Sequence, residues 1–208
     1  MHLAAQALVV PSYQNPLETF STNIIGTANL LESIRDIPSI KSCLIMTSDK
    51  AYENKELNYA YTENNPMGGI DPYSASKGAT ELIVSSYKKS FFNEKNSPGI
   101  ATIRAGNVIG GGDWANYRLI PDSIKSLISN KNIILRNPQS IRPWQHVLES
   151  LSGFLLVGSK LAKNSKKFSG PWNVGPSPKN ILSVESVVKK IIHQWGNGRI
   201  IIKKNNLH

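Results

Sequence analysis

Short apolar segments alternate along the chain with longer segments in which apolar residues recur at helical spacing. The runs at 42–47 and 100–104 are too short for helices, and their nearly continuous apolar character is typical of strands buried on both faces. The segment at 72–92 is long and amphipathic, which indicates a helix that covers such a sheet. Strands that alternate with helices in this way predict βαβ units and a parallel, doubly wound sheet.

The remaining elements follow from apolar spacing and from the turn residues between segments. Helices are expected at 16–34, 72–92, 121–129, 148–161 and 184–195. Strands are expected at 42–47, 100–104, 133–136, 172–174 and 199–203. No internal repeat, low-complexity tract or clean linker is visible, so no independent second domain is expected. Ligands bind such sheets at the carboxyl ends of the strands, so the residues that follow 47 and 104 are the informative ones.

The composition excludes several classes of protein. Apolar residues make up 40% of the 208 residues and charged residues 18%, as in soluble globular proteins. No apolar run approaches the ~20 residues of a membrane-spanning helix, and the first residues lack the basic start of a signal peptide. We therefore expect a cytoplasmic protein without a membrane partner. The single cysteine, Cys43, lies in an apolar run and is expected to be buried and unreactive.

The net charge of +10 raises the question of nucleic-acid binding. The lysines of the second half are scattered, and no finger, zipper or RNA-binding motif accompanies them. These lysines are Lys125, Lys131, Lys160, Lys163, Lys166, Lys167, Lys189, Lys190, Lys203 and Lys204. A solvated basic surface that attracts an anionic diphosphate is the simpler interpretation, so we expect neither nucleic acid as a partner nor a bound metal. A binding module for a nucleic acid or a partner protein is the alternative.

The strongest single signal for chemistry is the pair Tyr73 and Lys77, in the first turns of the helix expected from residue 72. Their i, i+4 spacing puts both side chains on one face of that helix. A lysine ammonium beside a phenol lowers the tyrosine pKa from its usual ~10, which suits a general base. The pair alone also fits an exposed tyrosine beside a solvated lysine. Ser48 adds specificity, because it follows the preceding strand where the fold brings its hydroxyl beside the tyrosine.

These three residues in a βαβ frame resemble the catalytic triad of the short-chain dehydrogenases/reductases. His-Leu-Ala-Ala-Gln at 2–6 and Asn-Ile-Ile-Gly-Thr at 23–27 resemble the extended subgroup of that family. Segments that look like the CDP-glucose 4,6-dehydratases are Thr-Ser-Asp-Lys at 47–50, Asn-Pro-Met-Gly-Gly at 65–69, Arg-Ala-Gly-Asn-Val-Ile-Gly-Gly-Gly-Asp-Trp at 104–114 and Ile-Arg-Pro-Trp-Gln-His-Val at 141–147. The long strings are specific, whereas the shorter ones are shared with epimerases and with dTDP- or GDP-sugar dehydratases. The similarity covers nearly the whole chain.

The resemblance implies an NAD-dependent internal redox cycle on CDP-glucose. The sugar is oxidised at C4, loses water across C5 and C6, and takes the hydride back at C6. Tyr73 would take the proton of the C4 hydroxyl, Ser48 would hydrogen-bond that oxygen, and Lys77 would hold the nicotinamide ribose. The residues that the resemblance implies at the cofactor are Leu3, Ala4, Ala5, Tyr73 and Lys77. Another nucleotide-sugar dehydratase and an epimerase of the same family are the enzymatic alternatives.

Asp49 and Lys50 follow Ser48, and the resemblance implies that they carry the loss of water. That step needs an acid for the departing C6 hydroxyl and a base for the C5 proton, and dTDP-glucose dehydratases have an Asp-Glu pair at the matching positions. Asp49 can be the acid if a dry pocket raises its pKa. Lys50 is either an amine base with a pKa lowered by burial or a cation that stabilises the enolate. A polar turn after a strand is the structural alternative.

The residues that the resemblance implies at the nucleotide diphosphate are Asn107, Arg118, Arg136 and Arg142. Arginine suits this task because its planar fork binds phosphate oxygens in pairs. Capping a turn is the alternative for Asn107, and a surface charge is the alternative for Arg142. Gly110, Gly111 and Gly112 lack the spacing of a phosphate-binding loop, so we expect a turn beside the sugar. His146 is expected to be a core or supporting histidine rather than a base.

The resemblance also implies a Rossmann-like NAD domain at 1–112 and 143–176, with an interleaved, truncated substrate-binding part at 113–142 and 177–208. The glycine-rich fingerprint that grips NAD is absent, and family members carry it upstream of the segment where this chain begins. We therefore expect a gene fragment or a degenerate copy that lacks the N-terminal strands. Alone it should be inactive, bind NAD poorly and self-associate through an open sheet edge. The full-length protein is expected to be a homo-oligomer.

Overall fold

The chain forms two compact units, each made of two separate segments of the sequence. The computed structural model describes residues 1–55, 60–94, 96–177 and 181–203. Unit 1 contains Met1–Gly106 and Glu149–Val174, and unit 2 contains Asn107–Leu148 and Gly175–His208. The sequence predicts boundaries after residues 112, 142 and 176, whereas the units change after residues 106, 148 and 174. That unit 2 binds a substrate stays a prediction.

Unit 1 is built on a parallel sheet. Its strands follow the order β1 (Ser42–Met46), β2 (Gly99–Ala105) and β7 (Gly170–Val174). His2 continues the sheet beyond β1, because its N–H donates to the Leu44 carbonyl at 2.7 Å and its carbonyl accepts the Met46 N–H at 3.0 Å. Parallel pairing throughout this sheet, with helices on both faces, confirms the α/β, Rossmann-like class.

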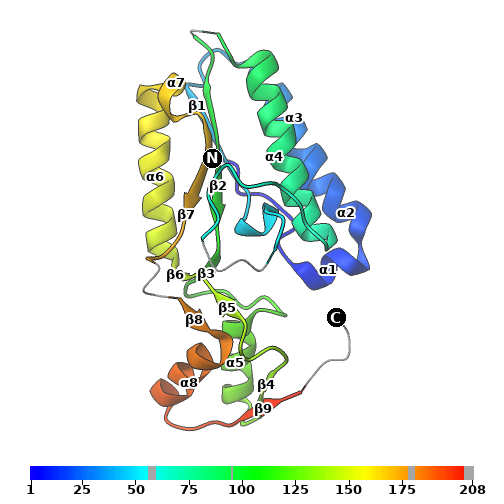
Figure 1. The fold of residues 1–208 in the computed structure, drawn as a ribbon, viewed down its shortest axis with the longest axis vertical. Helices are drawn as coiled ribbons and strands as arrows, with labels where there is room; N and C mark the ends of the chain where they lie inside the picture. The colour runs from blue at the N-terminus through cyan, green and yellow to red at the C-terminus, as the bar shows by residue number, and fades with distance from the viewer. Residues whose placement is uncertain (56–59, 95, 178–180, 204–208) are drawn as a thin grey trace. The chain divides into compact units, whose positions relative to one another are not determined.

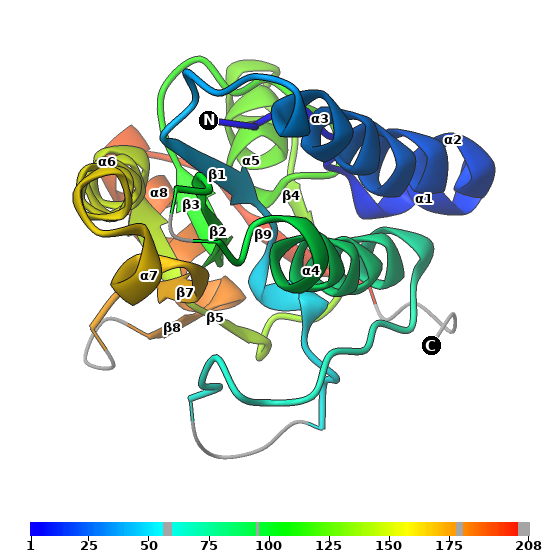
Figure 2. The same ribbon diagram turned by 90° about the horizontal axis from the view of Figure 1, so that it is seen from above.

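Helices cover both faces of this sheet (Figures 1 and 2). On one face lie α1 (Val9–Gln14), α2 (Pro16–Phe20), α3 (Gly26–Arg35) and α4 (Pro72–Phe91). On the other face lie α6 (Val147–Lys163) and α7 (Ser165–Phe168). The predicted positions of α4 and α6 are confirmed, whereas α1 and α7 are short additions that the spacing of apolar residues does not reveal.

The first predicted helix is interrupted by a π-helical turn at Ser21–Ile25, between α2 and α3. The backbone carbonyl of Asn23 accepts two hydroxyls, from Thr27 at 2.7 Å and from Thr80 at 3.0 Å. The side-chain oxygen of Asn23 accepts the Gln6 N–H at 2.8 Å, and its side-chain nitrogen donates to the Gln6 carbonyl at 3.0 Å. These bonds to distant residues hold a widened turn that local sequence patterns do not predict.

The core of unit 1 lies between the sheet and the helices α3 and α4. Its buried members are Leu31, Ile34, Cys43, Ile45, Val84, Phe92 and Ile100. The prediction that Cys43 is buried is confirmed. Burial raises the pKa of its thiol, which disfavours the reactive thiolate.

Unit 2 pairs its strands two by two over the residues that the structure describes. The parallel pairs are β3 (Asn107–Ile109) with β6 (Trp144–His146) and β4 (Ile133–Leu135) with β9 (Ile200–Ile202). The antiparallel pair is β5 (Ile141–Arg142) with β8 (Leu182–Ser183). The sequence predicts β4 and β9, whose residues are all apolar, whereas the other four strands each contain a polar residue and are not predicted.

Two helices complete unit 2, α5 (Leu119–Ile128) and α8 (Val184–Trp195). Their buried contacts with β4 form a small core of Leu127, Ile133, Leu135 and Val188. Helix α8 has the predicted ends, because Ser183 caps its start by accepting the Ser186 N–H at 3.2 Å and Gly196 stops it at φ +96°. Across the described ranges, no helix combines the length and the apolar character that crossing a membrane requires.

Candidate active site

Ser48 lies where β1 has ended and a short 3-10 turn, η2 (Asp49–Ala51), begins. Its Oγ accepts the Lys50 N–H at 3.2 Å and donates to Asp49 Oδ1 at 3.2 Å, so the side chain caps the turn. Ser48 is buried, Asp49 is half-buried and Lys50 is exposed. The amine-base alternative for Lys50 requires burial that the structure does not provide. The alternative in which Lys50 acts as a cation requires none.

Tyr73 lies in the first turn of α4, and neighbouring residues fix where that helix starts. Asp71 caps the helix by accepting the Ser74 N–H at 2.9 Å, and Pro72 occupies the first turn, where its missing N–H is not needed. Ser12 Oγ accepts the Tyr73 N–H at 3.1 Å. The tyrosine side chain is 9% exposed, so it packs inside unit 1 rather than on its surface.

Lys77 lies one turn further along α4 and is 4% exposed. Its Nζ donates to the carbonyl of Met46, the last residue of β1, at 3.2 Å. Burial lowers the pKa of Lys77 to about 8, against the charge of Glu81, which raises it. Because Met46 precedes Ser48 by two residues, this bond places Lys77 next to the segment that carries Ser48. That the Ser48 hydroxyl lies beside Tyr73 stays a prediction. The alternative of an exposed tyrosine beside a solvated lysine is wrong.

Gly69 lets the loop before α4 pass directly against the helix start. A Cβ at Gly69 would lie 2.4 Å from the carbonyl carbon of Ser74 and 2.5 Å from the backbone nitrogen of Ala75. We expect Gly69→Ala to lower the free energy of unfolding by about 1–3 kcal/mol, because the backbone of the Tyr73 turn must shift. Urea denaturation measures this loss. Gly111→Ala, where a Cβ would meet nothing within 4 Å, is the control, and equal losses in both variants would contradict the explanation.

The segment expected at the cofactor runs beside β1 and is partly open. Leu3 and Ala4 are exposed and Ala5 is half-buried. The two bonds between Asn23 and the backbone of Gln6 fix the end of this segment. Exposed residues next to the carboxyl end of β1 suit a ligand contact, but the role of these residues stays a prediction.

His2 is a neighbour of the site that sequence analysis did not single out. Its Nε2 lies 3.3 Å from Thr27 Oγ1, whose own proton goes to the Asn23 carbonyl. The imidazole Nε2 is therefore the donor in that contact. Burial, followed by the charge of Lys77, lowers the pKa of His2, so the ring is neutral near pH 7.

A buried ion pair between Arg104 and Glu81, next to Lys77 along α4, is a feature that the sequence patterns do not predict. Arg104 on β2 donates from Nε to Glu81 Oε1 at 2.8 Å and from a terminal nitrogen to Glu81 Oε2 at 2.9 Å. The two side chains are 4% and 6% exposed. Burial lowers the pKa of Arg104, but the hydrogen bonds and charge of Glu81 outweigh it and raise that pKa overall. An arginine at the end of an otherwise apolar strand was the available signal, because arginine is rarely buried without a partner.

The four residues expected at the diphosphate all belong to unit 2, on separate segments. Asn107 begins β3 and pairs with Trp144 of β6. Arg118 donates to Asp113 Oδ2 at 2.9 Å, and Arg136 and Arg142 are exposed. No contact joins these four residues to one another among the hydrogen bonds and ion pairs of the described chain, so their common role stays a prediction.

Two further expectations in unit 2 have clear outcomes. Gly111 and Gly112 form a turn, with Gly112 at φ +79°, as the sequence predicts, whereas its place beside a sugar stays a prediction. His146, expected to be a core or supporting histidine, is exposed, and its Nδ1 accepts the Leu148 N–H at 3.2 Å. The core location is therefore wrong, whereas a supporting role stays a prediction. The imidazole caps the start of α6 by accepting a backbone N–H, a role that the sequence around it does not suggest.

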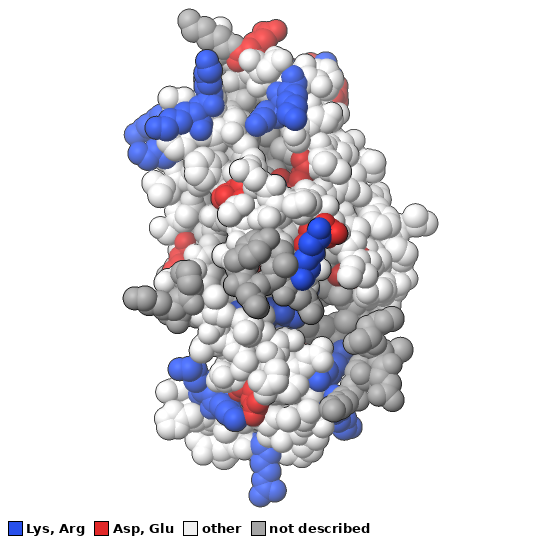
Figure 3. All heavy atoms as spheres, viewed as in Figure 1, with Lys and Arg blue, Asp and Glu red and all other residues white. Residues whose placement is uncertain are grey.

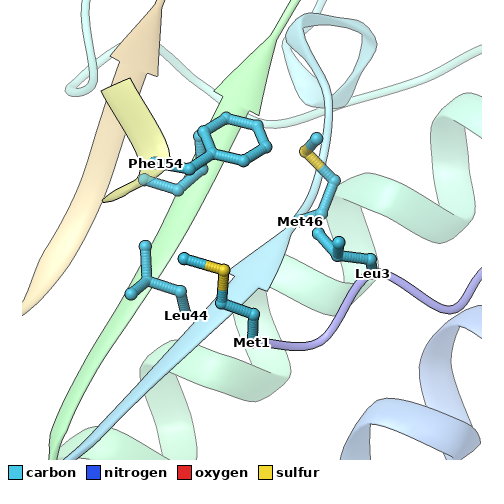
Figure 4. A pocket seen from close by; sticks show the side chains of 6 residues that line it. Met1, Leu3, Leu44, Met46 and Phe154 are labelled. Carbon is cyan, nitrogen blue, oxygen red and sulfur yellow. The ribbon is translucent and has the colours of Figure 1, made fainter. Parts of the chain in front are cut away.

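A small apolar hollow opens in unit 1 on the side of the sheet that faces α6 (Figure 4). Its lining consists of Met1, Leu3, Leu44, Met46, Ile103 and Phe154. Hydrocarbon and thioether groups line this hollow, without the convergent polar groups that orient a substrate. We therefore locate the candidate site at the carboxyl end of β1 instead. Within the described residues, His, Cys, Asp and Glu form no group able to hold a metal ion.

Comparisons with known proteins agree with the motifs. Residues 1–167 match the family described as GDP-mannose 4,6 dehydratase. A CDP-glucose 4,6-dehydratase from Salmonella typhimurium is 52% identical over 200 residues, which make up 94% of this chain and 56% of that protein. A CDP-paratose 2-epimerase from Salmonella typhi is 27% identical over 216 residues, covering 90% of this chain and 60% of that protein. The chain thus spans little more than half the length of these relatives.

A solved structure with the same architecture is a dTDP-glucose 4,6-dehydratase from Streptomyces venezuelae with NAD and TYD bound. It superposes with a TM-score of 0.82 at 21% identity, covering 100% of this chain and 61% of that one. At this identity the likeness concerns the fold alone, whereas the family follows from the sequence matches. The chain belongs to the GDP-mannose 4,6 dehydratase family, within the extended short-chain dehydrogenases/reductases that its motifs resemble.

Proposed function

We propose that the gene product carrying this chain is an NAD-dependent CDP-glucose 4,6-dehydratase, which forms CDP-4-keto-6-deoxyglucose. The observation that carries the proposal is the 52% identity to the Salmonella CDP-glucose 4,6-dehydratase over 94% of the chain. The buried Tyr73 and Lys77, beside the segment that carries Ser48, support it with a general base, a cation and a hydroxyl in one region of unit 1.

The residues around Lys77 fit the nicotinamide end of NAD. A lysine ammonium carries three donors, and the Met46 carbonyl takes one of them, so Lys77 is suited to hold ribose hydroxyls. The exposed residues Leu3 and Ala4 follow His2, which pairs with β1 at the same end. When bound, NAD supplies reversible hydride acceptance.

The side chains of unit 1 supply the proton chemistry in this proposal. Tyr73 takes the proton of the C4 hydroxyl, and the Lys77 ammonium stabilises the phenolate that makes this possible. Ser48 hydrogen-bonds the C4 oxygen. Burial of all three side chains excludes water, which strengthens each of these interactions.

Loss of water falls to the pair after Ser48 in this proposal. Asp49, half-buried, protonates the departing C6 hydroxyl. Lys50, which is exposed, stabilises the enolate through its charge, and the C5 proton passes to a base outside this pair. The remaining parts of the proposal are diphosphate contacts from unit 2, a homo-oligomeric state and a cytoplasmic location. The single buried cysteine is compatible with a reducing compartment.

Product analysis tests the proposed function. The gene product and NAD are incubated in separate reactions with CDP-glucose, dTDP-glucose, UDP-glucose, UDP-galactose and GDP-mannose. Products are identified by mass spectrometry and by chromatography against standards, which separates epimers of equal mass. We expect a product about 18 Da lighter than the substrate, because dehydration removes one water molecule. CDP-glucose should be converted fastest of the five substrates, because the resemblance points to cytidine. Conversion of UDP-galactose without loss of water would overturn the dehydratase proposal in favour of an epimerase, a class that includes the Salmonella typhi relative, named as a CDP-paratose 2-epimerase.

The basic charge leaves a binding module as the alternative from a different class. Within each unit, on the face shown in Figure 3, Lys and Arg side chains lie in separate groups rather than in one continuous stripe, which does not favour binding along a nucleic acid. Binding to a phosphate backbone weakens steeply as salt increases. Tight, salt-sensitive binding of DNA or RNA without any response to CDP-glucose would favour this alternative.

A further inference from the structure

We propose that Glu81 is a positioning residue for the candidate active site. Its carboxylate, anchored by Arg104, supplies the negative charge next to the buried Lys77 ammonium and holds α4 against the segment that carries Ser48. The idea deepens the proposed function and rests on it for its meaning in catalysis. The contacts on which it depends are nevertheless properties of the free protein.

Tyr73, Lys77 and Glu81 follow one another at intervals of four residues along α4. This spacing puts their side chains on one face of the helix, each one turn from the next. All three are buried, with exposed fractions of 9%, 4% and 6%. The helix therefore presents a phenol, an ammonium and a carboxylate to the interior of unit 1 in a fixed order.

Four hydrogen-bond donors fix the orientation of the Glu81 carboxylate, because they bond to both of its oxygens. Arg104 donates twice, and the hydroxyls of Thr47 and Thr102 donate at 2.5 Å and 2.8 Å. A carboxylate with both oxygens bonded in this way keeps one orientation. The negative charge one turn from Lys77 is consequently fixed in space.

Three consecutive residues connect the Glu81 clamp, which is the Glu81 carboxylate with its donors Arg104, Thr47 and Thr102, to the candidate site. The Met46 carbonyl accepts the Lys77 ammonium, the Thr47 hydroxyl donates to Glu81, and Ser48 is the candidate hydroxyl itself. The two contacts fasten both turns of α4 to one short stretch of backbone. The position of Ser48 relative to Lys77 therefore depends on the bond between Thr47 and Glu81.

Arg104 also bonds to groups other than Glu81. One of its terminal nitrogens donates to the Tyr52 hydroxyl at 2.8 Å and to the Glu63 carbonyl at 3.1 Å, and Tyr52 donates to Asn173 Oδ1 at 2.6 Å. The network thus ties α4 to β1, β2 and β7. A buried ion pair often gives no more stability than apolar residues of the same size, so stability alone does not account for charges at this place.

The charge of Glu81 affects the protonation of Lys77. Burial disfavours the charged form of Lys77, and the charge of Glu81 opposes that effect. The other titratable groups near Lys77 are Tyr73 on the same helix and His2 beside β1, which is neutral near pH 7. Asp49 lies in η2, which packs against α4. Removing the Glu81 charge leaves Arg104 unpaired and lowers the pKa of Lys77 further, so the ammonium is lost at a lower pH.

NMR titration of Lys77 tests the inference without substrate or cofactor. The gene product is labelled with lysine carrying ¹³C at Cε, and the Lys77 signal is assigned by its absence from Lys77→Arg. We expect Glu81→Gln to lower the pKa of Lys77 by about 1 or more, the size of an opposite charge at close range. Thr102→Val, which removes one donor but keeps the carboxylate, should leave that pKa unchanged. An unshifted Lys77 in a folded Glu81→Gln protein would overturn the inference.

A double variant keeps the test decisive if Glu81→Gln does not fold. Glu81→Gln with Arg104→Met removes both buried charges and leaves neither unpaired. The pKa of Lys77 should still lie below the wild-type value in this protein, and below that in Arg104→Met alone. A Lys77 that titrates as in the wild type would overturn the inference here too. Because no turnover is measured, a failed CDP-glucose assay would count against the proposed function and not against this one.

Discussion

Replacing Tyr73 with phenylalanine is expected to slow oxidation of the sugar at C4 by at least about 100-fold, the lower end of a general-base contribution. The variant lacks the hydroxyl that takes the substrate proton but keeps the ring that packs in unit 1. Its backbone N–H still bonds to Ser12, so the start of α4 stays in place. Rapid-mixing absorbance of the reduced cofactor with CDP-glucose measures the effect directly.

Tyr87→Phe is the matched control for this experiment. It makes the same chemical change on the same helix, at a hydroxyl that donates to Glu32 Oε2 at 3.1 Å on the surface. We expect this control to oxidise CDP-glucose at the wild-type rate. A Tyr73→Phe enzyme as fast as the control would exclude Tyr73 as the base, and the search would turn to the neutral His2 beside the same end of β1.

The variants Asp49→Asn and Lys50→Met are each expected to slow the loss of water by at least about 100-fold while oxidation at C4 remains detectable. The asparagine cannot protonate the departing C6 hydroxyl, and the methionine cannot offset the charge of the enolate. Both side chains leave the capping bond between Ser48 Oγ and the backbone N–H at position 50 intact. Reduced cofactor should therefore accumulate on the enzyme, and release of the dehydrated product, followed by mass spectrometry, should lag behind it.

Lys55→Met provides the control for the loss of positive charge. Lys55 is exposed and pairs with Glu53 at 3.0 Å, so its removal changes the net charge as Lys50→Met does, at a residue outside the proposed machinery. Dehydration at the wild-type rate in Lys50→Met would remove that residue from the mechanism and return it to the polar-turn interpretation. Slow dehydration in both lysine variants would instead indicate an effect of net charge on substrate attraction.

Local patterns were sufficient wherever an element is long or ends at a residue with a strong conformational preference. The helix predicted at 184–195 matches α8 at both ends because Ser183 and Gly196 are local signals for a cap and a stop. The π-helical turn at Ser21–Ile25 depends instead on the Asn23 carbonyl meeting the Thr80 hydroxyl, 57 residues away. A pattern read over a few residues contains no information about such a partner.

The same distinction applies to the candidate site. The motif spacing predicts Tyr73 and Lys77 on one helix face, and strand order predicts Ser48 near them. The pairing of Glu81 with Arg104 joins residues on a helix and a strand, 23 positions apart, and becomes visible only when both are buried. The sequence also cannot predict that Lys50 and His146 are exposed. Lys50 lies in a turn after a strand and His146 lies just before a helix, and at such positions tertiary packing decides whether a side chain is covered.

The interleaving of the two units has a consequence for synthesis on the ribosome. Gly170 of β7 aligns with Ala101 of β2, so the chain must grow by 170 − 101 = 69 residues before that pairing can begin. At about 5–20 residues per second, β2 waits roughly 3–14 seconds with one edge open to pairing with other nascent chains. Most of the residues made in this interval belong to unit 2 or to α6. The order of the segments, rather than the apolar content of β2, sets the length of this vulnerable period.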